Sequence, residues 1–390
     1  MTSPDPLAAL DGAPVWVMAK GYAPDEGGMQ TYAQGVAEAY ARAGARVTVF
    51  TQTSAGPREE TLGAARLVDI GAGKSPMVPL RLLKALGAKR RSEGAPAFLH
   101  ATTWRTSVVP MLLGLPYITT FHGREFMYPA GIALRLMRRV ARRARGILAV
   151  SHYSAMRLSE RLGPDASAPL VAWNGLSQEP DPDAPLPVKH SARHEGVPLI
   201  FTLCRLEPRK NVAAAVRACA RVRGEGASFR YVIGGRGPEL ERIRALVADL
   251  GLEDCVEVAG FMPTARVEQL YREADIFLHP QIEADGGRDF EGFGIAIADA
   301  MVTASAVVAG IDGGTRELIE DEVHGLAVDG HDEEAIARAL SRLVTDAPFR
   351  ESLGAAAHAR TLREFTWKRH IFRIAERFPV ASTSQAGNQL

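Results

Sequence analysis

The sequence has little cysteine: Cys204, Cys219 and Cys255 are the only three in 390 residues. An odd number without C-x-x-C spacing predicts neither a disulfide framework nor a zinc site, and it fits a reducing cytoplasm. No run of eighteen or more apolar residues occurs, and the first residues lack the basic start and apolar core of a signal peptide. We therefore expect a cytoplasmic protein that is neither secreted nor membrane-spanning.

Three common binding motifs are also missing. The turn at 232–239, VIGGRGPE, lacks the G-x-G-x-x-G spacing of dinucleotide sites, which argues against a nicotinamide-dependent dehydrogenase. Aromatic residues are not interleaved with the basic ones, so we expect no nucleic-acid partner. The nearest approach to D-x-D is Asp181-Pro182-Asp183, which lies in a polar linker rather than after a strand. We accordingly expect no bound metal and no cofactor.

With 46% hydrophobic and 23% charged residues, the chain has the composition of a soluble globular protein long enough for two domains. Residues 1–190 hold 22 Lys and Arg against 15 Asp and Glu, a net charge of +7. Much of that excess lies in a helical pattern at 134–145, whose arginines are Arg135, Arg138, Arg139, Arg142, Arg143 and Arg145. A basic amphipathic helix suits an anionic membrane surface. A solvated helix whose arginines pair with local acids explains the pattern equally well.

Apolar runs alternate with helical patterns along the first half of the chain. A strand at 15–18, a helix at 30–43 and a second strand at 47–50 predict a βαβ unit. Further strands, predicted at 97–100, 117–121 and 147–150, extend it into an open parallel sheet. A polar, Pro-rich stretch from Ser177 to Pro198 then interrupts the periodicity, and we interpret it as an interdomain linker.

A second alternation follows the linker. Strands are predicted at 199–202, 230–234, 256–259, 276–278 and 306–309, and helices at 212–223, 239–250, 266–273 and 295–301. The expected fold class is α/β, with two doubly wound Rossmann-like domains at 1–185 and 186–365. A final helical stretch, roughly 348–378, runs into the segment 366–390, whose last residues, 381–390, are expected to be flexible. Ligands of such sheets bind at the carboxyl ends of the strands.

The clearest site pattern is at 291–317, EGFGIAIADAMVTASAVVAGIDGGTRE. Its two leading glycines allow a tight turn, and a helix beginning there leaves unpaired amides that bind an anion. A carboxylate ahead of the turn can accept sugar hydroxyls, so the pattern predicts a sugar-diphosphate site. The alternative is a helix N-terminus flanked by acids. The residues assigned to the site are Glu291, Gly292, Phe293, Gly294 and Ile295.

Asp299 and a pair of cations complete the second-domain prediction. Asp299 lies more than a helical turn beyond Glu291, too far for an acid/base pair, and is assigned a separate ligand contact, most simply ribose. In LCRLEPRKNV, Arg205 closes a predicted strand and Lys210 precedes a helix, so both can point toward a ligand at the strand ends. The alternative is an ordinary basic loop, and Arg209 is predicted to lie on the surface.

Two N-terminal motifs allow a functional and a purely structural interpretation. In DEGGMQTY, Gly27 and Gly28 precede a helix and offer free amides to an anion, although a tight βα turn without a ligand explains them equally well. In FHGREF, His122 ends an apolar strand with Gly123 behind it. Taken alone, such a residue is more often a buried, hydrogen-bonded core histidine than a ligand contact.

The joint pattern resembles a known family. Two acids separated by seven residues, Glu291 and Asp299, with GFG between, and the Gly-Gly-x-x-Glu turn at 313–317 are similar to the retaining GT-B glycosyltransferases of family 4. The motifs at Gly27-Gly28, His122, Arg205 and Lys210 occur in the family's order across about 290 residues. The chain departs from the pattern at Asp299, where the family usually has Glu, and Asp is shorter by ~1.5 Å. Ala304 and Ala306 stand where Gly and Pro are common.

The resemblance implies roles for these residues. Arg205 and Lys210 would stabilise the leaving diphosphate, together with Glu291 as a catalytic residue, and His122 would face the donor sugar. The donor would also contact Gly27 and Gly28, and the backbone of Gly260, Phe261 and Met262 would read the nucleobase. The residues assigned to the acceptor are Gln30, Tyr32, Arg124 and Glu125. Ser151 and Asn174-Gly175 also match family positions and are as easily turn residues.

The same resemblance implies a GT-B architecture, in which the two domains face each other across a cleft and the last helix crosses back to the first domain. The implied reaction is metal-independent transfer of a hexose from a UDP- or GDP-sugar with retention of configuration. A lipid or lipid-linked glycan at the inner membrane surface is the favoured acceptor, because of the basic helix. The alternative acceptors are a natural product, a sugar phosphate or a polysaccharide. The fold also allows a different function, that of a catalytically silent partner subunit, since Asp299 departs from the motif.

Overall fold

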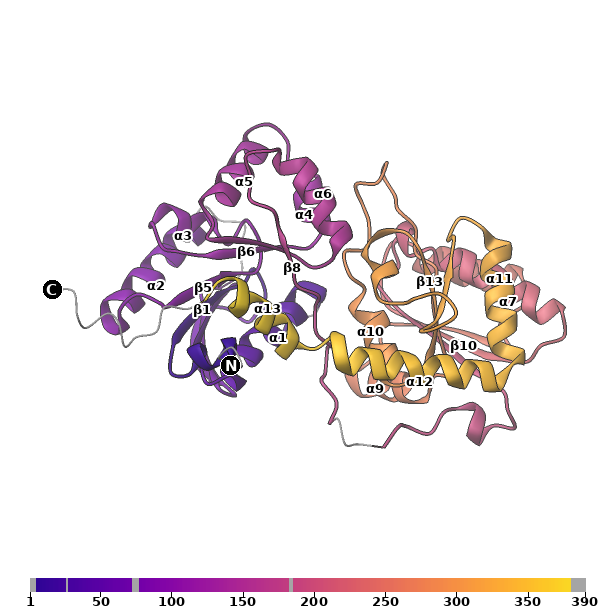
Figure 1. Ribbon diagram of the computed structural model, residues 1–390. Helices are drawn as coiled ribbons and strands as arrows, with labels where there is room; N and C mark the ends of the chain where they lie inside the picture. Colours follow the sequence, from indigo (N-terminus) through magenta and orange to yellow (C-terminus); the bar gives the residue numbers. More distant parts are fainter. Residues whose placement is uncertain (1–4, 26, 72–76, 182–184, 380–390) are drawn as a thin grey trace. The chain divides into compact units, whose positions relative to one another are not determined.

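The computed structural model describes residues 5–25, 27–71, 77–181 and 185–379, which form two compact units (Figure 1). The first unit contains residues 5–175 and 366–379, and the second is Leu176–Phe365. The division falls at Gly175 and Leu176 rather than at 185/186, and the expected flexible stretch at 381–390 lies outside the described residues. No helix among those described is both long and apolar enough to cross a membrane.

The first unit is built on an eight-stranded sheet in the order β3-β4-β2-β1-β5-β6-β7-β8. All neighbouring strands are parallel except the β3–β4 pair. The strands are β1 (Pro14–Met18), β2 (Arg46–Thr51), β3 (Arg58–Leu62), β4 (Ala65–Asp69), β5 (Phe98–Ala101), β6 (Ile118–Phe121), β7 (Gly146–Ala149) and β8 (Leu170–Val171). Central strands such as β5, β6 and β7 are buried throughout, which explains their continuous apolar runs.

Helices cover this sheet, and the last of them comes from the end of the chain. They are η1 (Pro6–Leu10), α1 (Gly28–Arg42), α2 (Met77–Glu93), α3 (Val108–Leu112), α4 (Arg124–Met127), α5 (Gly131–Arg143), α6 (His152–Leu162) and α13 (Trp367–Arg377). Figure 1 shows α13 beside α1. The first residue of α13, Trp367, packs so closely on Gly35 that a Cβ there would lie 2.0 Å from the indole ring. Only glycine leaves room for this contact.

The second unit has a six-stranded, all-parallel sheet in the order β11-β10-β9-β12-β13-β14. The strands are β9 (Leu199–Leu203), β10 (Arg230–Gly234), β11 (Val256–Gly260), β12 (Ile276–His279), β13 (Ala306–Gly310) and β14 (Leu326–Val328). The helices are η2 (Ser191–Arg193), η3 (Pro208–Lys210), α7 (Val212–Gly224), α8 (Leu240–Asp249), α9 (Thr264–Glu273), α10 (Ile295–Val302), η4 (Gly313–Glu317), α11 (Glu333–Thr345) and α12 (Ala347–Glu364).

The two-domain α/β prediction is therefore confirmed, and the structure adds the strands β3, β4, β8 and β14, of which β3, β8 and β14 are edge strands. The strand β3 has the sequence REETL, and charged residues of this kind on an edge strand prevent pairing with another chain. The helical stretch predicted at 348–378 is two helices, because the chain leaves helical geometry at Phe365 and the Thr366 side chain then accepts a hydrogen bond from the Arg369 amide.

Candidate active site

Two loops of the second unit meet where its strand order reverses. The strands β10 and β11 lie on one side of β9, and the next strand along the chain, β12, lies on the other side. The loop after β9 carries Arg205, Arg209 and Lys210, and the loop after β12 carries Asp289 and Glu291. Because parallel neighbouring strands end at the same edge, both loops lie at the carboxyl edge of the sheet. Doubly wound folds bind ligands at such a reversal.

A carboxylate and two cations form the centre of this site. Glu291 Oε2 accepts hydrogen bonds from Arg209 Nη1, at 2.7 Å, and from Lys210 Nζ. Arg209 Nε also lies 3.2 Å from an Asp289 carboxylate oxygen. The side chains of Arg209, Lys210 and Glu291 are only 15%, 10% and 16% exposed, so their charges are largely shielded from solvent. We call Arg209, Lys210 and Glu291 the charge cluster.

Burial alone raises the pKa of Glu291, but the charges of Lys210 and Arg209 outweigh burial and hold it well below its usual range. Burial and the neighbouring charge of Lys210 lower the pKa of His279 to about 4. Glu291 is therefore an anion and His279 a neutral imidazole at pH 7.

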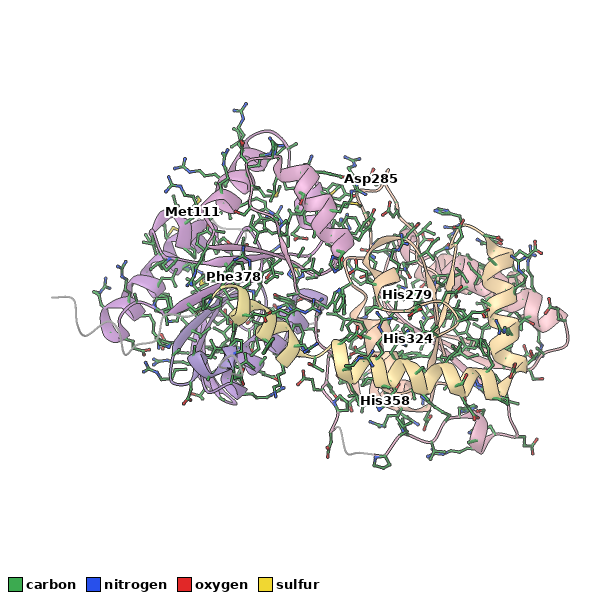
Figure 2. The ribbon with its side chains drawn as sticks, viewed as in Figure 1. Met111, His279, Asp285, His324, His358 and Phe378 are labelled. Atoms are coloured by element: carbon green, nitrogen blue, oxygen red, sulfur yellow. The ribbon has the colours of Figure 1, made fainter. Side chains whose placement is uncertain are left out.

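Hydrogen bonds determine the tautomer of His279, which lies in the interior of the second unit (Figure 2). Its Nδ1 is 2.8 Å from the side-chain oxygen of Gln281, and its Nε2 is 3.5 Å from Lys210 Nζ. The Gln281 amide nitrogen donates to the carbonyl of Gly310, so the Gln281 oxygen faces His279. Nδ1 must then carry the proton, and Nε2 accepts from Lys210. This chain of bonds holds the ammonium group beside Glu291.

Glycines let other backbone segments approach these loops. A Cβ on Gly235 would lie 1.7 Å from the carbonyl oxygen of Cys204, and one on Gly237 would lie 2.2 Å from that of Leu206. The GGRG turn therefore supports the loop that presents the cations. On the other side, a Cβ on Gly313 would lie 2.6 Å from the Glu291 carbonyl oxygen, which accepts a hydrogen bond from the Gly314 amide. Both glycine turns of the sequence thus hold the charge cluster in place.

The N-terminus of α10 follows directly after Glu291. Gly294 has a positive φ of 96° and makes no side-chain cap, so the first amides of the helix have no capping side chain. The geometry predicted for an anion site is present here. Phe293 is buried, with its ring centroid 5.6 Å from that of Phe365, so only its backbone can face a ligand. Gly292 and Ile295 flank it and are partly exposed.

Asp299 lies on α10 and is engaged within the second unit. Its Oδ1 accepts a hydrogen bond from the amide of Ser177 at 2.8 Å. Burial raises the pKa of Asp299 to about 6, although the bonds from Ser177 act in the opposite direction. In this structure the shorter acid fastens the first residues of the linker to the helix, and the ribose contact stays a prediction.

The structure corrects the assignment of the cations. Arg209, predicted to lie on the surface, points inward and contacts Glu291, whereas Arg205 is 76% exposed and pairs with Glu207 at 2.9 Å. Lys210 contacts Glu291 at the carboxyl edge of the sheet, and its contact with a ligand stays a prediction. Sequence patterns missed His279 and the inward direction of Arg209, because both depend on which loop packs opposite. The position of His279 at the last residue of a buried strand was the available signal.

The turn after β11 presents the residues predicted to read a nucleobase. Gly260 has a φ of 66°, which favours glycine. Phe261 is 51% exposed, and the guanidinium of Arg236 lies 4.1 Å from its ring centroid. Met262 is buried under Gly234. An exposed aromatic face with an adjacent cation can stack on a planar base.

In the first unit, His122 follows β6 at the carboxyl edge of the sheet. Its Nε2 lies 2.8 Å from the carbonyl oxygen of Thr102, so that nitrogen carries a proton. The ring packs edge-on against Tyr32, with centroids 4.6 Å apart. The Glu125 carboxylate accepts hydrogen bonds from the amides of His122 and Gly123, at 2.6 and 2.9 Å. Glu125, predicted to contact an acceptor, therefore holds this turn.

Tyr32 is likewise not at an acceptor-facing surface. It is fully buried, and its hydroxyl lies within 3.2 Å of His100 Nε2, Thr120 Oγ1 and His370 Nε2. Burial, the first cause in each case, lowers the pKa of His370 to about 4 and that of His100 well below its usual range. The prediction that Tyr32 contacts an acceptor is wrong, because the returning helix α13 covers it.

The remaining first-unit candidates lie on exposed turns. Gly27 has a φ of 143° and Gly28 begins α1, both at the surface, and the Gln30 side chain folds back over Gly27. Arg124 is exposed and lies 5.3 Å from the Tyr128 ring centroid. Among the described residues, no group of three or more His, Cys, Asp or Glu could hold a metal ion.

Comparison with known proteins decides the family. The model of glycosyl transferases group 1 matches residues 188–360, and that of glycosyltransferase family 4 matches residues 26–179. The chain belongs to the family 4 (group 1) GT-B glycosyltransferases. Most of the chain, including every predicted site motif, lies within the two matches.

This glycosyltransferase is similar over most of its length to bacterial enzymes. It is 29% identical over 291 residues to a GDP-mannose-dependent alpha-(1-6)-phosphatidylinositol monomannoside mannosyltransferase of Mycolicibacterium smegmatis, covering 70% of this chain and 75% of the relative. It is 28% identical over 377 residues to a D-inositol 3-phosphate glycosyltransferase of Acidothermus cellulolyticus, covering 86% and 82%.

Solved structures show the same fold. A sucrose-phosphate synthase from Thermosynechococcus elongatus has a TM-score of 0.74 at 19% identity, covering 93% of this chain and 98% of that one. Anabaena HepE, solved with UDP and glucose, has a TM-score of 0.70 at 18% identity and the same coverage.

The charge cluster generates a stability prediction. Lys210→Ala should destabilise the glycosyltransferase by about 3 kcal/mol, because it removes one of the two cations that compensate the buried Glu291 carboxylate. In the double variant, Lys210→Ala with Glu291→Gln, part of this lost stability should be recovered. Urea unfolding of the single and double variants should then give a coupling energy of at least about 1 kcal/mol between the two substitutions. The matched control, Arg205→Ala, removes a 76% exposed cation and should cost less than about 1 kcal/mol. If the effects of the two substitutions on the free energy of unfolding simply added, the described contact between Lys210 and Glu291 would be contradicted.

Asp299 generates a pH prediction. Its folded pKa is raised, so the folded state binds the extra proton and the contribution of Asp299 to stability falls as pH rises from about 4 to about 6. Asp299→Asn keeps the acceptor for the Ser177 amide and removes the titration. The difference in unfolding free energy between the variant and the parent should therefore grow by about 2 kcal/mol in favour of the variant between pH 4 and pH 7. A difference independent of pH would show that Asp299 is not buried as described.

Proposed function

We propose that this glycosyltransferase moves a hexose from a UDP- or GDP-sugar to an acceptor with retention of configuration and without a metal ion. The observation that carries the proposal is the charge cluster beside the uncapped N-terminus of α10. Fixed cations and helix amides of this kind stabilise a leaving diphosphate, because they are already oriented before charge develops on it.

Each part of the second unit has a role in this proposal. Lys210 and Arg209 neutralise the diphosphate, and Glu291, ionised at pH 7, accepts hydroxyls of the sugar. Neutral His279 keeps the Lys210 ammonium in place without adding a second charge. The exposed face of Phe261 stacks on the nucleobase, next to Arg236. The relative from Mycolicibacterium smegmatis is GDP-mannose-dependent by name, and HepE was solved with UDP, which supports these two donors for the test.

Retention follows in this proposal from attack on the same face of the sugar as the leaving group. In that mechanism the departing phosphate takes the proton of the acceptor hydroxyl, so no enzyme nucleophile is required. His122 presents its ring at the carboxyl edge of the first sheet, and its Nε2 proton is held by Thr102. The other ring nitrogen is then the one that can contact the donor sugar. Positioning, rather than covalent chemistry, lowers the barrier.

A thermal-shift panel with UDP, GDP, ADP and dTDP tests the donor, with NADH as the control. A nucleoside diphosphate at 100 times its dissociation constant stabilises the folded state by ~2.7 kcal/mol. One diphosphate should raise the melting temperature, and Lys210→Ala should remove most of that shift. With the matching sugar nucleotide, NMR of the product should show the donor's anomeric configuration. Stabilisation by NADH alone would exclude transfer, and no shift with any nucleotide would favour a catalytically silent subunit.

We propose further that the acceptor is a lipid or lipid-linked glycan, reached through α5. Arg135, Arg139 and Arg143 are exposed and form no ion pair with any residue that the structure describes, and Arg142 lies 3.9 Å from Asp165. Local acids therefore do not neutralise this face, which favours an anionic surface as its partner. Ile132, at the start of the same helix, is 82% exposed. Arg138 instead donates to the carbonyl of Arg161 and supports the fold.

Replacing Arg135, Arg139, Arg142 and Arg143 by Gln should lower binding to anionic vesicles at least tenfold, since each cation near such a surface contributes ~1 kcal/mol. Co-sedimentation with phosphatidylglycerol vesicles measures this, and the shift caused by the nucleoside diphosphate should be unchanged. The control variant neutralises four exposed arginines of the second unit, Arg242, Arg244, Arg338 and Arg342. Equal vesicle binding by the parent and the α5 variant would favour a soluble acceptor.

A further inference from the structure

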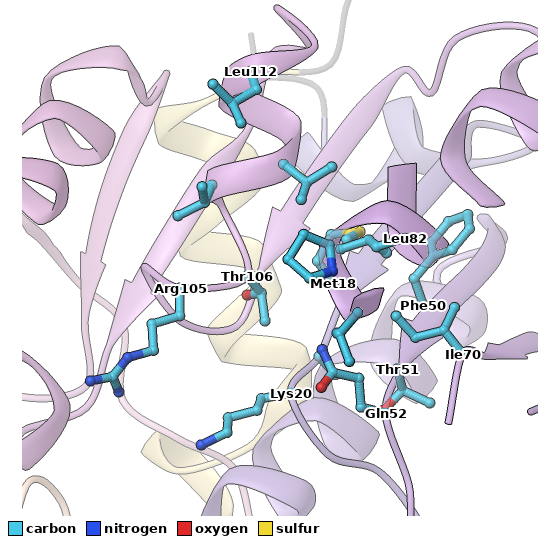
Figure 3. A pocket seen from close by; sticks show the side chains of 15 residues that line it. Met18, Lys20, Phe50, Thr51, Gln52, Ile70, Leu82, Arg105, Thr106 and Leu112 are labelled. Atoms are coloured by element: carbon cyan, nitrogen blue, oxygen red, sulfur yellow. The ribbon is translucent and has the colours of Figure 1, made fainter. Parts of the chain in front are cut away.

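An apolar cavity of about 250 Å3 lies in the first unit (Figure 3), and none of its lining residues was assigned to a site above. Its lining comes from the carboxyl ends of β1 and β2, from the turns that follow them and β4 and β5, and from α2 and α3. Its apolar lining includes Met18, Phe50, Ile70, Val78, Leu82 and Val109. Its volume is below the roughly 300–1,000 Å3 of sites that enclose a whole drug-sized ligand. The cavity therefore suits a segment of an apolar chain.

Polar groups gather on one side of this cavity. Figure 3 shows Lys20 and Arg105 on the side opposite Phe50, Ile70 and Leu82. Both cations are exposed, and neither forms an ion pair within the described part of the chain. Lys20 follows β1 and Arg105 follows β5, and the strand order of this sheet reverses between those two strands. The cations thus lie at the point where a doubly wound sheet binds its ligand.

A buried hydroxyl also lines the cavity without a hydrogen-bond partner. Thr51 is 1% exposed, and its Oγ1 has no partner among the residues that the structure describes. A buried polar atom left unsatisfied is costly. Gln52, the next residue of the lining, can bond to the polar end of a bound molecule.

One residue of the lining is an exposed leucine. Leu112 of α3 is 71% exposed, and on α2, outside the lining, Leu80 and Leu83 are 55% and 40% exposed. In Figure 1, α3 lies between α2 and α5, and it packs against both. Leu112 therefore lies on a helix that packs against the basic helix α5. Apolar side chains beside cations are what an anionic lipid surface contacts.

We propose that the cavity binds the apolar chain of the acceptor lipid, whose phosphate-bearing head lies against Lys20 and Arg105. This assignment rests on the proposed glycosyl transfer to a lipid and adds the place and chemistry of its acceptor. The chain enters past Leu112, the exposed leucine of the lining. The head stays at the carboxyl edge of the sheet, the edge that also carries His122.

A chain-length series of alkyl phosphates tests the proposal on the full-length protein by titration calorimetry, below micelle-forming concentrations. Affinity should rise by about fourfold per methylene from butyl to octyl phosphate until the cavity is full. Inorganic phosphate should bind at least a hundredfold more weakly than octyl phosphate. The double variant Lys20→Ala with Arg105→Ala should bind octyl phosphate at least tenfold more weakly but bind 1-octanol with unchanged affinity. Affinity independent of chain length, or of these two cations, would overturn the assignment.

A filled cavity gives the second arm of the test. Leu82→Trp places a larger ring in the lining and should lower octyl phosphate affinity at least tenfold, whereas Leu83→Trp, on the exposed face of the same helix, should not. If the circular dichroism spectrum of Leu82→Trp differs from that of the parent, this variant is misfolded. The octyl phosphate affinity of the Lys20/Arg105 double variant then decides the proposal alone. Failure of octyl phosphate to bind while a nucleoside diphosphate still stabilises the protein would reject the cavity and leave glycosyl transfer intact. Octyl phosphate binding without sugar transfer would reject transfer and keep the cavity.

Discussion

The buried carboxylate of Glu291 is the constraint on which the second unit depends. An ionised carboxylate in a poorly solvated place must be compensated, and here Lys210 and Arg209 provide the opposite charges. The three side chains come from loops after different strands, so the cluster can form only when β9 and β12 lie side by side with their carboxyl ends level. It fastens the two loops together and directs the N-terminus of α10 to the same place.

The glycines around the cluster follow from that constraint. Gly235 and Gly237 lie against the backbone of the cation loop, and Gly313 lies against that of the carboxylate loop, at distances that no Cβ allows. They bring neighbouring turns close enough to hydrogen-bond the loops through backbone groups. His279 adds a further layer, since its neutral ring accepts from Lys210 while Gln281 holds the other nitrogen. The glycine turns at 234–237 and 313–314 thus support the loops of the site through their backbone.

The first unit places its polar groups by a different arrangement. His122 is held by the carbonyl of Thr102 and the ring of Tyr32, and the hydroxyl of Tyr32 is held in turn by His370 of the returning helix. A residue 338 positions away from Tyr32 in the chain therefore supports the turn that presents His122. The cavity at the carboxyl ends of β1 and β2 is lined by residues from six separate elements or turns, and its two cations come from two more turns.

The sequence by itself determined the α/β class, most of the parallel strands and the turns that carry Lys210, Glu291 and the N-terminus of α10. The hydrophobic period of a helix or strand and the positions of glycines are local properties of the sequence. Continuous apolar runs are likewise a clear local sign of buried parallel strands. Only the tertiary structure decided that Arg209 points inward and Arg205 outward, that Tyr32 is a core residue, and that Glu125 holds the turn after β6. It also decided the place of His279 and the existence of the apolar cavity. Side-chain direction and burial depend on which distant segment packs opposite, and that partner is not encoded in any local pattern.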